Sequence, residues 1–179
     1  LTVDGAYKAA DFINFCDAYD IPVLSLTNVK GYAADVRSEK SIAKAVAKLT
    51  YAFANANVPK VNVITGEAYG SAYVTMNSKA LGADVTYAWP DASIGMMDAN
   101  EAAKIMYADD IAKSADVQSV ISEKAAEYAA LQSGVESAAA RGYVDTIINP
   151  EDTRKYVAAA FEMLYTKRED RPDKKHGTV

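Results

Sequence analysis

Glu67-Ala68-Tyr69-Gly70-Ser71-Ala72-Tyr73 directly follows an apolar run at 61–65 and precedes a segment that can continue as a helix. The apolar run predicts a buried strand. A strand that turns on small residues and re-enters as a helix leaves backbone N–H groups free at the turn. Those groups, with the positive end of the helix dipole behind them, can hold a developing oxyanion. The same small residues would also suit plain close packing of a helix on a strand, and the pattern alone leaves both interpretations open.

Composition narrows the class of protein. The chain has 179 residues and a net charge of −5, and no long basic run precedes its C-terminal tail, which argues against nucleic-acid binding. The single cysteine, Cys16, excludes an internal disulfide and favours a reducing, cytoplasmic location, where we expect it to be a buried structural thiol. No signal peptide and no apolar stretch of bilayer length occurs. The opening residues resemble mid-protein sequence, so we expect a piece of a longer polypeptide.

Helical and strand patterns alternate along the chain. This alternation predicts an α/β fold with much parallel pairing in a domain over 1–166, followed by a charged tail at 167–179. Strands are predicted at 21–27, 60–65, 84–89, 93–96 and 144–148. Helices are predicted at 5–19, 39–57, 99–107, 116–131, 134–141 and 150–166.

Several helix faces and caps can be specified. In the first helix, Phe12, Phe15, Cys16 and Tyr19 have the spacing of one apolar face, with Asp4 as the predicted cap. Ser38 is the predicted cap of the second helix, and one face of that helix is formed by Ile42, Val46, Leu49 and Phe53. Asp98 and Glu101 have capping-box spacing before the third helix.

The side chains of this sequence provide no recognisable catalytic or metal-binding motif. Ser71 lacks a nucleophile elbow, and the only histidine, His176, lies in the tail, so a Ser-His-Asp triad is not supported. One histidine and one cysteine make no metal cluster, and no phosphate-binding glycine loop is present. Asp98, Glu101, Asp109 and Asp110 suit helix caps and solvated faces better than a catalytic carboxylate pair. A chain without a base, but with an oxyanion turn, suits a reaction whose substrate or cofactor supplies the base.

Eight segments spread over nearly the whole chain share a pattern with one known family. They are 11–23, 51–54, 58–60, 68–76, 81–90, 141–154, 167–169 and 172–177. Together they resemble the C-terminal half of the biotin-dependent acyl-CoA carboxyltransferases. That family includes the β subunits of propionyl-CoA and acetyl-CoA carboxylases and the carboxyltransferase subunit of methylmalonyl-CoA decarboxylase.

The resemblance implies a crotonase-like (ClpP/crotonase) ββα spiral and a role as the half that holds carboxybiotin. It implies biotin on a separate carrier domain as cofactor and coenzyme A as part of the substrate, with no metal. The backbone N–H groups of Ser71 and Ala72 would stabilise charge on the biotin ureido oxygen. Tyr69, Gly70 and Tyr73 would lie beside the cofactor, and Val74 occupies a position associated with acyl-group selection.

The resemblance also implies partners. These are an N-terminal carboxyltransferase half, a biotin carboxyl carrier protein, and biotin carboxylase or decarboxylase subunits, within a homo-hexamer. The chain departs from the family's usual pattern at 28–32, at Glu67, where a basic residue is common, and at Val74, where Asp is common. These departures leave open which acyl-CoA is used and whether carboxylation or decarboxylation is the direction.

Two other classes of function remain as alternatives. A crotonase-fold hydratase or thioesterase acting on CoA would need a carboxylate near the turn, for which Glu67 and Asp98 are the candidates. A non-catalytic assembly domain would have kept the fold for subunit contacts alone.

Overall fold

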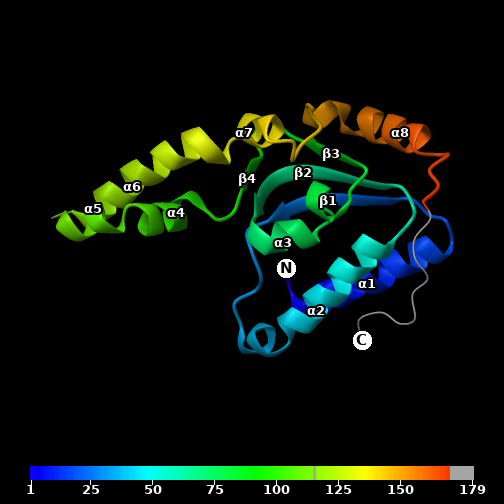
Figure 1. Ribbon diagram of the computed structural model, residues 1–179, viewed down its shortest axis with the longest axis horizontal. Helices are drawn as coiled ribbons and strands as arrows, with labels where there is room; N and C mark the ends of the chain where they lie inside the picture. The colour runs from blue at the N-terminus through cyan, green and yellow to red at the C-terminus, as the bar shows by residue number, and fades with distance from the viewer. Residues whose placement is uncertain (115, 170–179) are drawn as a thin grey trace.

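The computed structural model describes residues 1–114 and 116–169, and these residues form a parallel sheet with helices on both faces (Figure 1). In this part of the chain the strand order is β1-β2-β3-β5, and β4 pairs with the far end of β2. All four pairings are parallel, as the alternation of strands and helices predicts. The strands are β1 (Val23–Val29), β2 (Lys60–Tyr69), β3 (Val85–Ala88), β4 (Ser93–Gly95) and β5 (Thr146–Ile147).

The long strand β2 positions the turn singled out in the sequence. Its first half pairs with β3, from Val61 opposite Val85 to Ile64 opposite Ala88. Its second half leaves β3 and pairs with β4, where Tyr69 lies opposite Gly95. The strand therefore runs on past the predicted end at 65 and carries the turn to the far edge of the sheet.

Helices α1 (Val3–Ala18) and α2 (Val36–Asn55) pack together on one side of the sheet (Figure 1). The predicted face of α1 is wrong for Phe12, Phe15 and Tyr19, which are 60%, 54% and 67% exposed, and right for Cys16, which is buried. The buried stripe instead contains small residues, which allow α1 to approach α2 closely. It consists of Val3, Ala6, Ala10, Ile13 and Cys16.

The caps of these two helices also differ from prediction by a few residues. Thr2, not Asp4, caps α1, and the Asp4 carboxylate instead accepts a hydrogen bond from Arg37 at 2.7 Å. Asp35, not Ser38, caps α2, accepting from the Ser38 N–H at 2.8 Å. Both true caps are residues of the preferred type in extended backbone just before the first turn.

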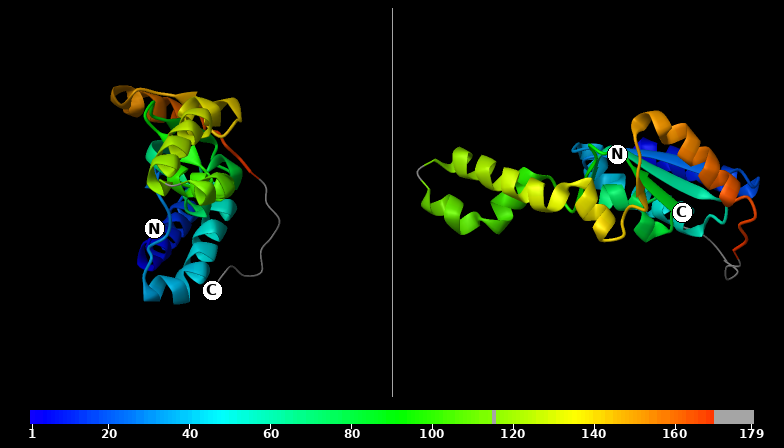
Figure 2. Two further views of the ribbon diagram at one scale, coloured as in Figure 1. Left: turned by 90° about the vertical axis from the view of Figure 1, so that its left-hand side faces the viewer. Right: turned by 90° about the horizontal axis from the view of Figure 1, so that it is seen from above.

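A helical arm projects away from the sheet (Figures 1 and 2). It contains α4 (Ala99–Met106), α5 (Ala108–Lys113) and α6 (Val117–Tyr128), with α4 packed on α6. Asp98 caps α4 as predicted, but Glu101 forms an ion pair with Lys104 at 2.7 Å instead of completing a capping box. Helix α5 was not predicted, and α6 passes into a π-helical turn at Ala129–Ser133, where a continuous helix to 131 was expected.

The remaining elements complete the two faces. Helix α3 (Gly70–Thr75) follows β2, α7 (Val135–Ala140) follows the arm, and α8 (Thr153–Met163) covers the face of the sheet opposite α1 and α2 (Figure 1). Single 3₁₀ turns occur at Lys79–Leu81 and Pro150–Asp152. Within the described residues, no helix combines the length and the hydrophobicity that a bilayer-spanning segment requires.

The predicted charged tail begins with a buried contact. The Lys167 side chain is 13% exposed and its ammonium lies 2.9 Å from the Asp84 carboxylate. Lys167 also donates to the Val58 carbonyl at 3.3 Å. Residues 170–179, including His176, lie outside the described part of the chain.

Candidate functional site

The strand-to-helix turn is built around Gly70. Its φ is +59°, a conformation that side-chain-bearing residues rarely adopt. A Cβ at this position would lie 2.9 Å from the Met96 carbonyl oxygen, which is too close for an unstrained contact. Both the backbone angle and the neighbouring strand therefore require glycine where β2 becomes α3.

Tyr69 anchors the turn to its surroundings. The Tyr69 hydroxyl donates to Ser93 Oγ at 2.8 Å, and the Ser93 hydroxyl in turn donates to the Ser133 carbonyl at 3.3 Å. The side chain of Tyr69 is 7% exposed. These contacts join the end of β2 to β4 and to the π-helical turn, so the Tyr69 side chain fixes the turn from behind and is not part of the adjacent pocket lining.

The first turn of α3 presents backbone groups. No side chain caps this turn, and the N–H groups of Ser71 and Ala72 occupy the second and third helical positions, which have no acceptor within a helix. The Ser71 side chain is exposed, whereas Ala72 is 1% exposed and packs in the core beneath the helix. The chemistry available from these two residues is therefore that of their backbone N–H groups.

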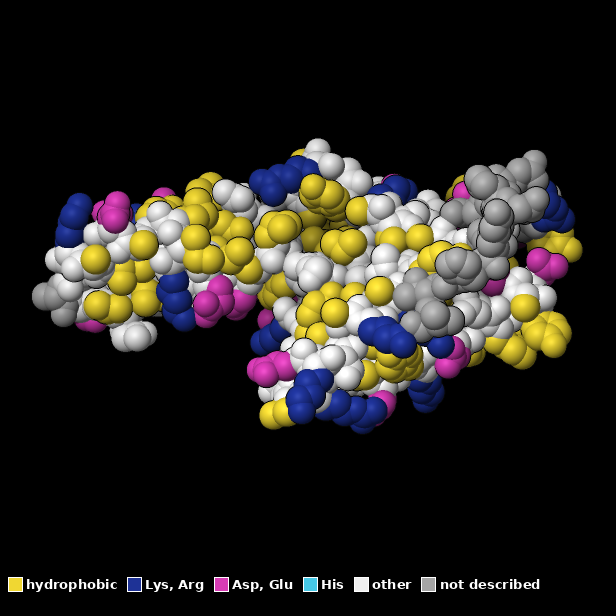
Figure 3. Space-filling view, turned by 60° about the horizontal axis from the view of Figure 1, so that its bottom comes forward, with side chains coloured by type: hydrophobic (Ala, Val, Ile, Leu, Met, Phe, Trp, Pro, Cys, Tyr) yellow, Lys and Arg dark blue, Asp and Glu magenta, His cyan; other side chains and the backbone are white. Residues whose placement is uncertain are grey.

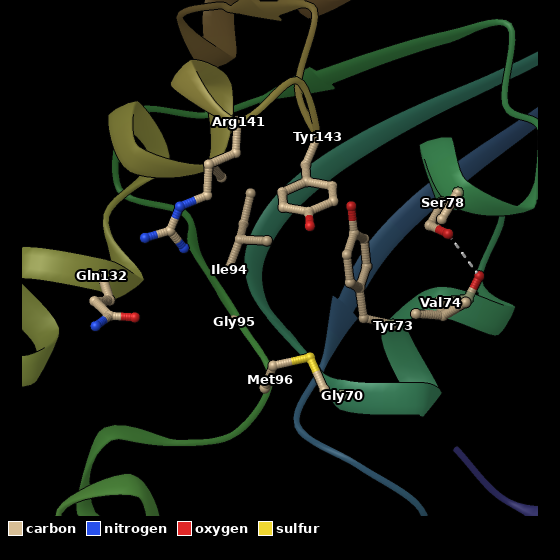
Figure 4. Close-up of a pocket in the computed structure, with 12 residues that line it drawn as sticks. Gly70, Tyr73, Val74, Ser78, Ile94, Gly95, Met96, Gln132, Arg141 and Tyr143 are labelled. Carbon is tan, nitrogen blue, oxygen red and sulfur yellow. Dashed lines mark hydrogen bonds between the residues drawn. The ribbon is translucent and has the colours of Figure 1, made fainter.

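A pocket of about 280 Å³ lies against α3, between β4 and α7 (Figure 4). Of the residues singled out in the sequence, it brings together Gly70, Tyr73 and Val74, and Val74 is 39% exposed there. The sequence prediction missed the opposite wall, which Arg141 and Tyr143 provide. Both lie in a segment that resembles the carboxyltransferase family, but only the folded chain places that segment across from α3.

Hydrophobic side chains surround this region of the surface. Figure 3 shows them running along the arm to the place where it joins the body. The exposed members include Met96, which is 78% exposed, and Leu131, which is 67% exposed. Met96 also lines the pocket, so apolar surface extends outward from the pocket at this residue.

Tyr73 contributes a buried polar group to the pocket. The residue is 7% exposed, and its hydroxyl has no hydrogen-bond partner among the described residues. Burial, with a smaller contribution from Tyr143, raises the pKa of Tyr73 to about 12. The phenol therefore stays neutral at physiological pH and can donate a hydrogen bond, but it is a poor base.

Glu67 contacts both Asn28 and Lys30 beside the turn. The Lys30 ammonium lies 3.1 Å from the Glu67 carboxylate, and this contact raises the pKa of Lys30. The Glu67 N–H donates to Asn28 Oδ1 at 3.0 Å. A Cβ on Gly66 would lie 2.8 Å from the same oxygen. The Glu67 carboxylate is thus paired with a cation, and its backbone N–H is bound by the Asn28 amide oxygen.

The candidate acids are engaged elsewhere. The Glu67 carboxylate is paired with Lys30, and the Asp98 carboxylate accepts from the N–H groups of Asn100 and Glu101. No acidic residue lines the pocket among the described residues. The same part of the chain contains no group of three or more metal-ligating side chains.

The chain is similar to known proteins along its whole length. Residues 1–179 match the carboxyl transferase domain. The propionyl-CoA carboxylase beta chain of Saccharopolyspora erythraea is 46% identical over 100% of this chain and 34% of its own length. Methylmalonyl-CoA decarboxylase subunit alpha of Propionigenium modestum is 43% identical over 100% of this chain and 35% of its own.

A solved structure of a carboxyltransferase is also similar to this chain. The transcarboxylase 12S crystal structure, described as a hexamer with methylmalonyl-CoA and methylmalonic acid bound, matches with a TM-score of 0.93 and 42% identity. The match covers 99% of this chain and 34% of that one. The chain spans about a third of the length of the curated relatives it matches.

Proposed function

Because the chain belongs to the carboxyl transferase domain family, we propose that it forms the biotin-side wall of an acyl-CoA carboxyltransferase active site. The reaction moves a carboxyl group between carboxybiotin and a short acyl-CoA, for which propionyl-CoA, acetyl-CoA and methylmalonyl-CoA are the candidates. The family match and the likeness to transcarboxylase 12S also confirm the predicted crotonase-like α/β fold.

The observation that carries this proposal is a turn that offers donors but no base. Ser71 and Ala72 follow Gly70 in the first turn of α3. Gly70 lines a pocket with apolar walls, whereas Ser71 and Ala72 are not among its lining residues, and no acid lines that pocket among the described residues. These features fit biotin, which presents a carbonyl oxygen on a largely apolar ring. When bound, carboxybiotin would supply the carboxyl group. Once that carboxyl group has left, biotin would supply the base for the α-proton of the acyl thioester.

The chain's own residues then have distinct tasks. The N–H groups of Ser71 and Ala72 would hold the ureido oxygen of biotin and stabilise negative charge on it, and each donor of this kind contributes roughly 3 kcal/mol in the transition state. Tyr69 and Gly70 hold the turn in place, and Tyr73 closes the pocket with a neutral hydroxyl. Val74, exposed at the pocket, bears on which acyl group is accepted.

The complete enzyme in this proposal has further parts. An N-terminal half supplies the acyl-CoA site, a biotin carboxyl carrier protein delivers the cofactor, and biotin carboxylase or decarboxylase subunits complete the cycle. A homo-hexamer is the proposed assembly, supported by the hexameric 12S structure. The free, buried Cys16 supports a cytoplasmic location.

A CoA hydratase or thioesterase is less well supported. Both need a carboxylate near the oxyanion turn, and Glu67 and Asp98 are held by Lys30 and by backbone N–H groups. If Glu67→Gln and Asp98→Asn abolished a hydration or hydrolysis activity of the assembled enzyme, that alternative would be restored.

The test is carboxyl transfer by the assembled enzyme, in which this chain is joined to the acyl-CoA-binding half. Radiolabelled carboxylated carrier protein is supplied with acetyl-CoA, propionyl-CoA or butyryl-CoA, and labelled carboxyacyl-CoA is measured. The reverse assay supplies methylmalonyl-CoA and uncarboxylated carrier. Labelled product with at least one acyl-CoA is expected. Failure of transfer in both directions with every acyl-CoA would reject the proposal.

A further inference from the structure

The pocket beside α3 contains one cation in an apolar setting. Among its described lining residues, Arg141 is the only charged one, whereas Val74, Ile94 and Met96 supply apolar surface. At about 280 Å³ the pocket lies near the small end of the usual range of ligand sites, about 300–1,000 Å³. It therefore suits a small apolar body that carries a negative group.

Arg141 is available to bind such a group. It follows the last residue of α7, and within 1–114 and 116–169 no ion pair or hydrogen bond engages its guanidinium. Figure 4 shows the guanidinium extending toward Ile94 and Gln132 at the pocket. A planar guanidinium presents paired N–H donors that match the two oxygens of a carboxylate.

A second observation points to the same kind of ligand. The hydroxyl of Tyr73 is buried without a partner, an arrangement that costs free energy unless a ligand satisfies it. In Figure 4 it lies beside the hydroxyl of Tyr143, which comes from the opposite wall of the pocket. Because the pKa of Tyr73 is raised to about 12, its hydroxyl remains a donor and would not repel an anion.

We infer that Arg141, with Tyr73 and Tyr143, forms a carboxylate site that holds the carboxyl group being transferred. The inference rests on the proposed function and adds to it a specificity-determining cation outside the oxyanion turn. Two sources share this chemistry: the carboxylate of a carboxyacyl-CoA, and the carboxylate of carboxybiotin. No covalent step is assigned to Arg141, which binds and orients the anion.

The experiment compares carboxylated with uncarboxylated ligands in the assembled enzyme. Wild type, Arg141→Met, Arg141→Lys and Tyr73→Phe are titrated with methylmalonyl-CoA and with propionyl-CoA, which differ by one carboxylate. Steady-state KM values are measured for carboxylated carrier protein in the forward direction and for uncarboxylated carrier in the reverse direction. Arg154→Met is the matched control, because Arg154 is an exposed arginine on α8, away from the pocket.

Loss of a charged hydrogen-bonding partner should weaken the carboxylated ligand by about 10- to 100-fold in Arg141→Met, with propionyl-CoA and uncarboxylated carrier changed less than about twofold. Arg141→Lys should recover part of the loss, and Tyr73→Phe should weaken the same ligand less. Selective weakening of methylmalonyl-CoA supports the site and assigns it to the acyl group. Selective elevation of the KM for carboxylated carrier supports the site and assigns it to the cofactor.

Equal effects on carboxylated and uncarboxylated ligands, or none, would overturn the inference. Thermal unfolding of each variant identifies a general loss of structure, and Tyr73→Phe then provides the test, because it removes only an unpartnered hydroxyl. Absence of transfer in the wild-type enzyme would reject the proposed function itself. Transfer in wild type without carboxylate selectivity in the variants would reject only the carboxylate site.

Discussion

Replacing Gly70 by alanine tests the geometry of the turn. At φ +59° an L side chain costs roughly 1–2 kcal/mol. The new Cβ would also lie 2.9 Å from the Met96 carbonyl oxygen, and crowding of this kind typically costs about 1–3 kcal/mol. The two effects add to roughly 2–5 kcal/mol if the turn stays rigid, so we expect it to move and to carry the Ser71 and Ala72 N–H groups with it.

Displaced donors should lower kcat by about 10²–10³, the usual effect of losing an oxyanion contact. Alanine substitutions at two other glycines separate the cost of a strained backbone from the cost of crowding. Gly82→Ala has the strained backbone, at φ +102°, but its Cβ would meet nothing nearer than Lys60 Nζ at 3.8 Å. Gly31→Ala has neither strain nor any atom within 4 Å.

Urea unfolding of the chain and carboxyl transfer by the assembled enzyme are measured for all three variants. Gly70→Ala should lose both stability and kcat, Gly82→Ala should lose mainly stability, and Gly31→Ala should resemble wild type. Wild-type kcat in Gly70→Ala, with stability equal to that of Gly31→Ala, would refute the argument that this turn depends on glycine.

Three further changes have defined outcomes. Val74→Asp should change the ratio of kcat/KM between acetyl-CoA and propionyl-CoA several-fold, because the side chain is exposed at the pocket; an unchanged ratio would remove Val74 from acyl selection. Asp84→Asn should lower the free energy of unfolding by about 1–3 kcal/mol in urea, because the carboxylate contacts both Lys167 and the Lys60 N–H, and no loss would contradict this. Hydrogen bonds from Ser38 lower the pKa of Asp35 below 3.8, so its stabilising effect is present above pH 3.8 and is lost as the pH falls through the lowered value. The stability gap between wild type and Asp35→Ala should therefore close in acid, and a gap that widened there would show the opposite sign.

The sequence located the turn because its signals are local. An apolar run at 61–65 gives way to small residues, and the strand and helix that meet there follow from that change. The cap at Asp98 was likewise predictable, since a capping side chain reaches only two or three residues along the chain.

Features that depend on distant contacts were not predictable in this way. Phe12, Phe15 and Tyr19 have helical spacing, yet the buried face of α1 is set by its fit against α2, where small residues pack more closely. Arg141 and Tyr143 reach the pocket only because the chain returns from the arm to lie across from α3. Spacing along the sequence contains no record of that return.

The most direct test of the central claim is the rate of carboxyl transfer in two adjacent variants of the assembled enzyme. Ala72→Pro removes a backbone N–H in the first turn of α3, at a position whose N–H has no acceptor within the helix. Ser71→Ala removes an exposed hydroxyl and keeps its N–H. The account predicts a fall in kcat of about 10²–10³ for Ala72→Pro and little change for Ser71→Ala. A folded Ala72→Pro enzyme with wild-type kcat, or a Ser71→Ala enzyme as impaired as Ala72→Pro, would contradict it.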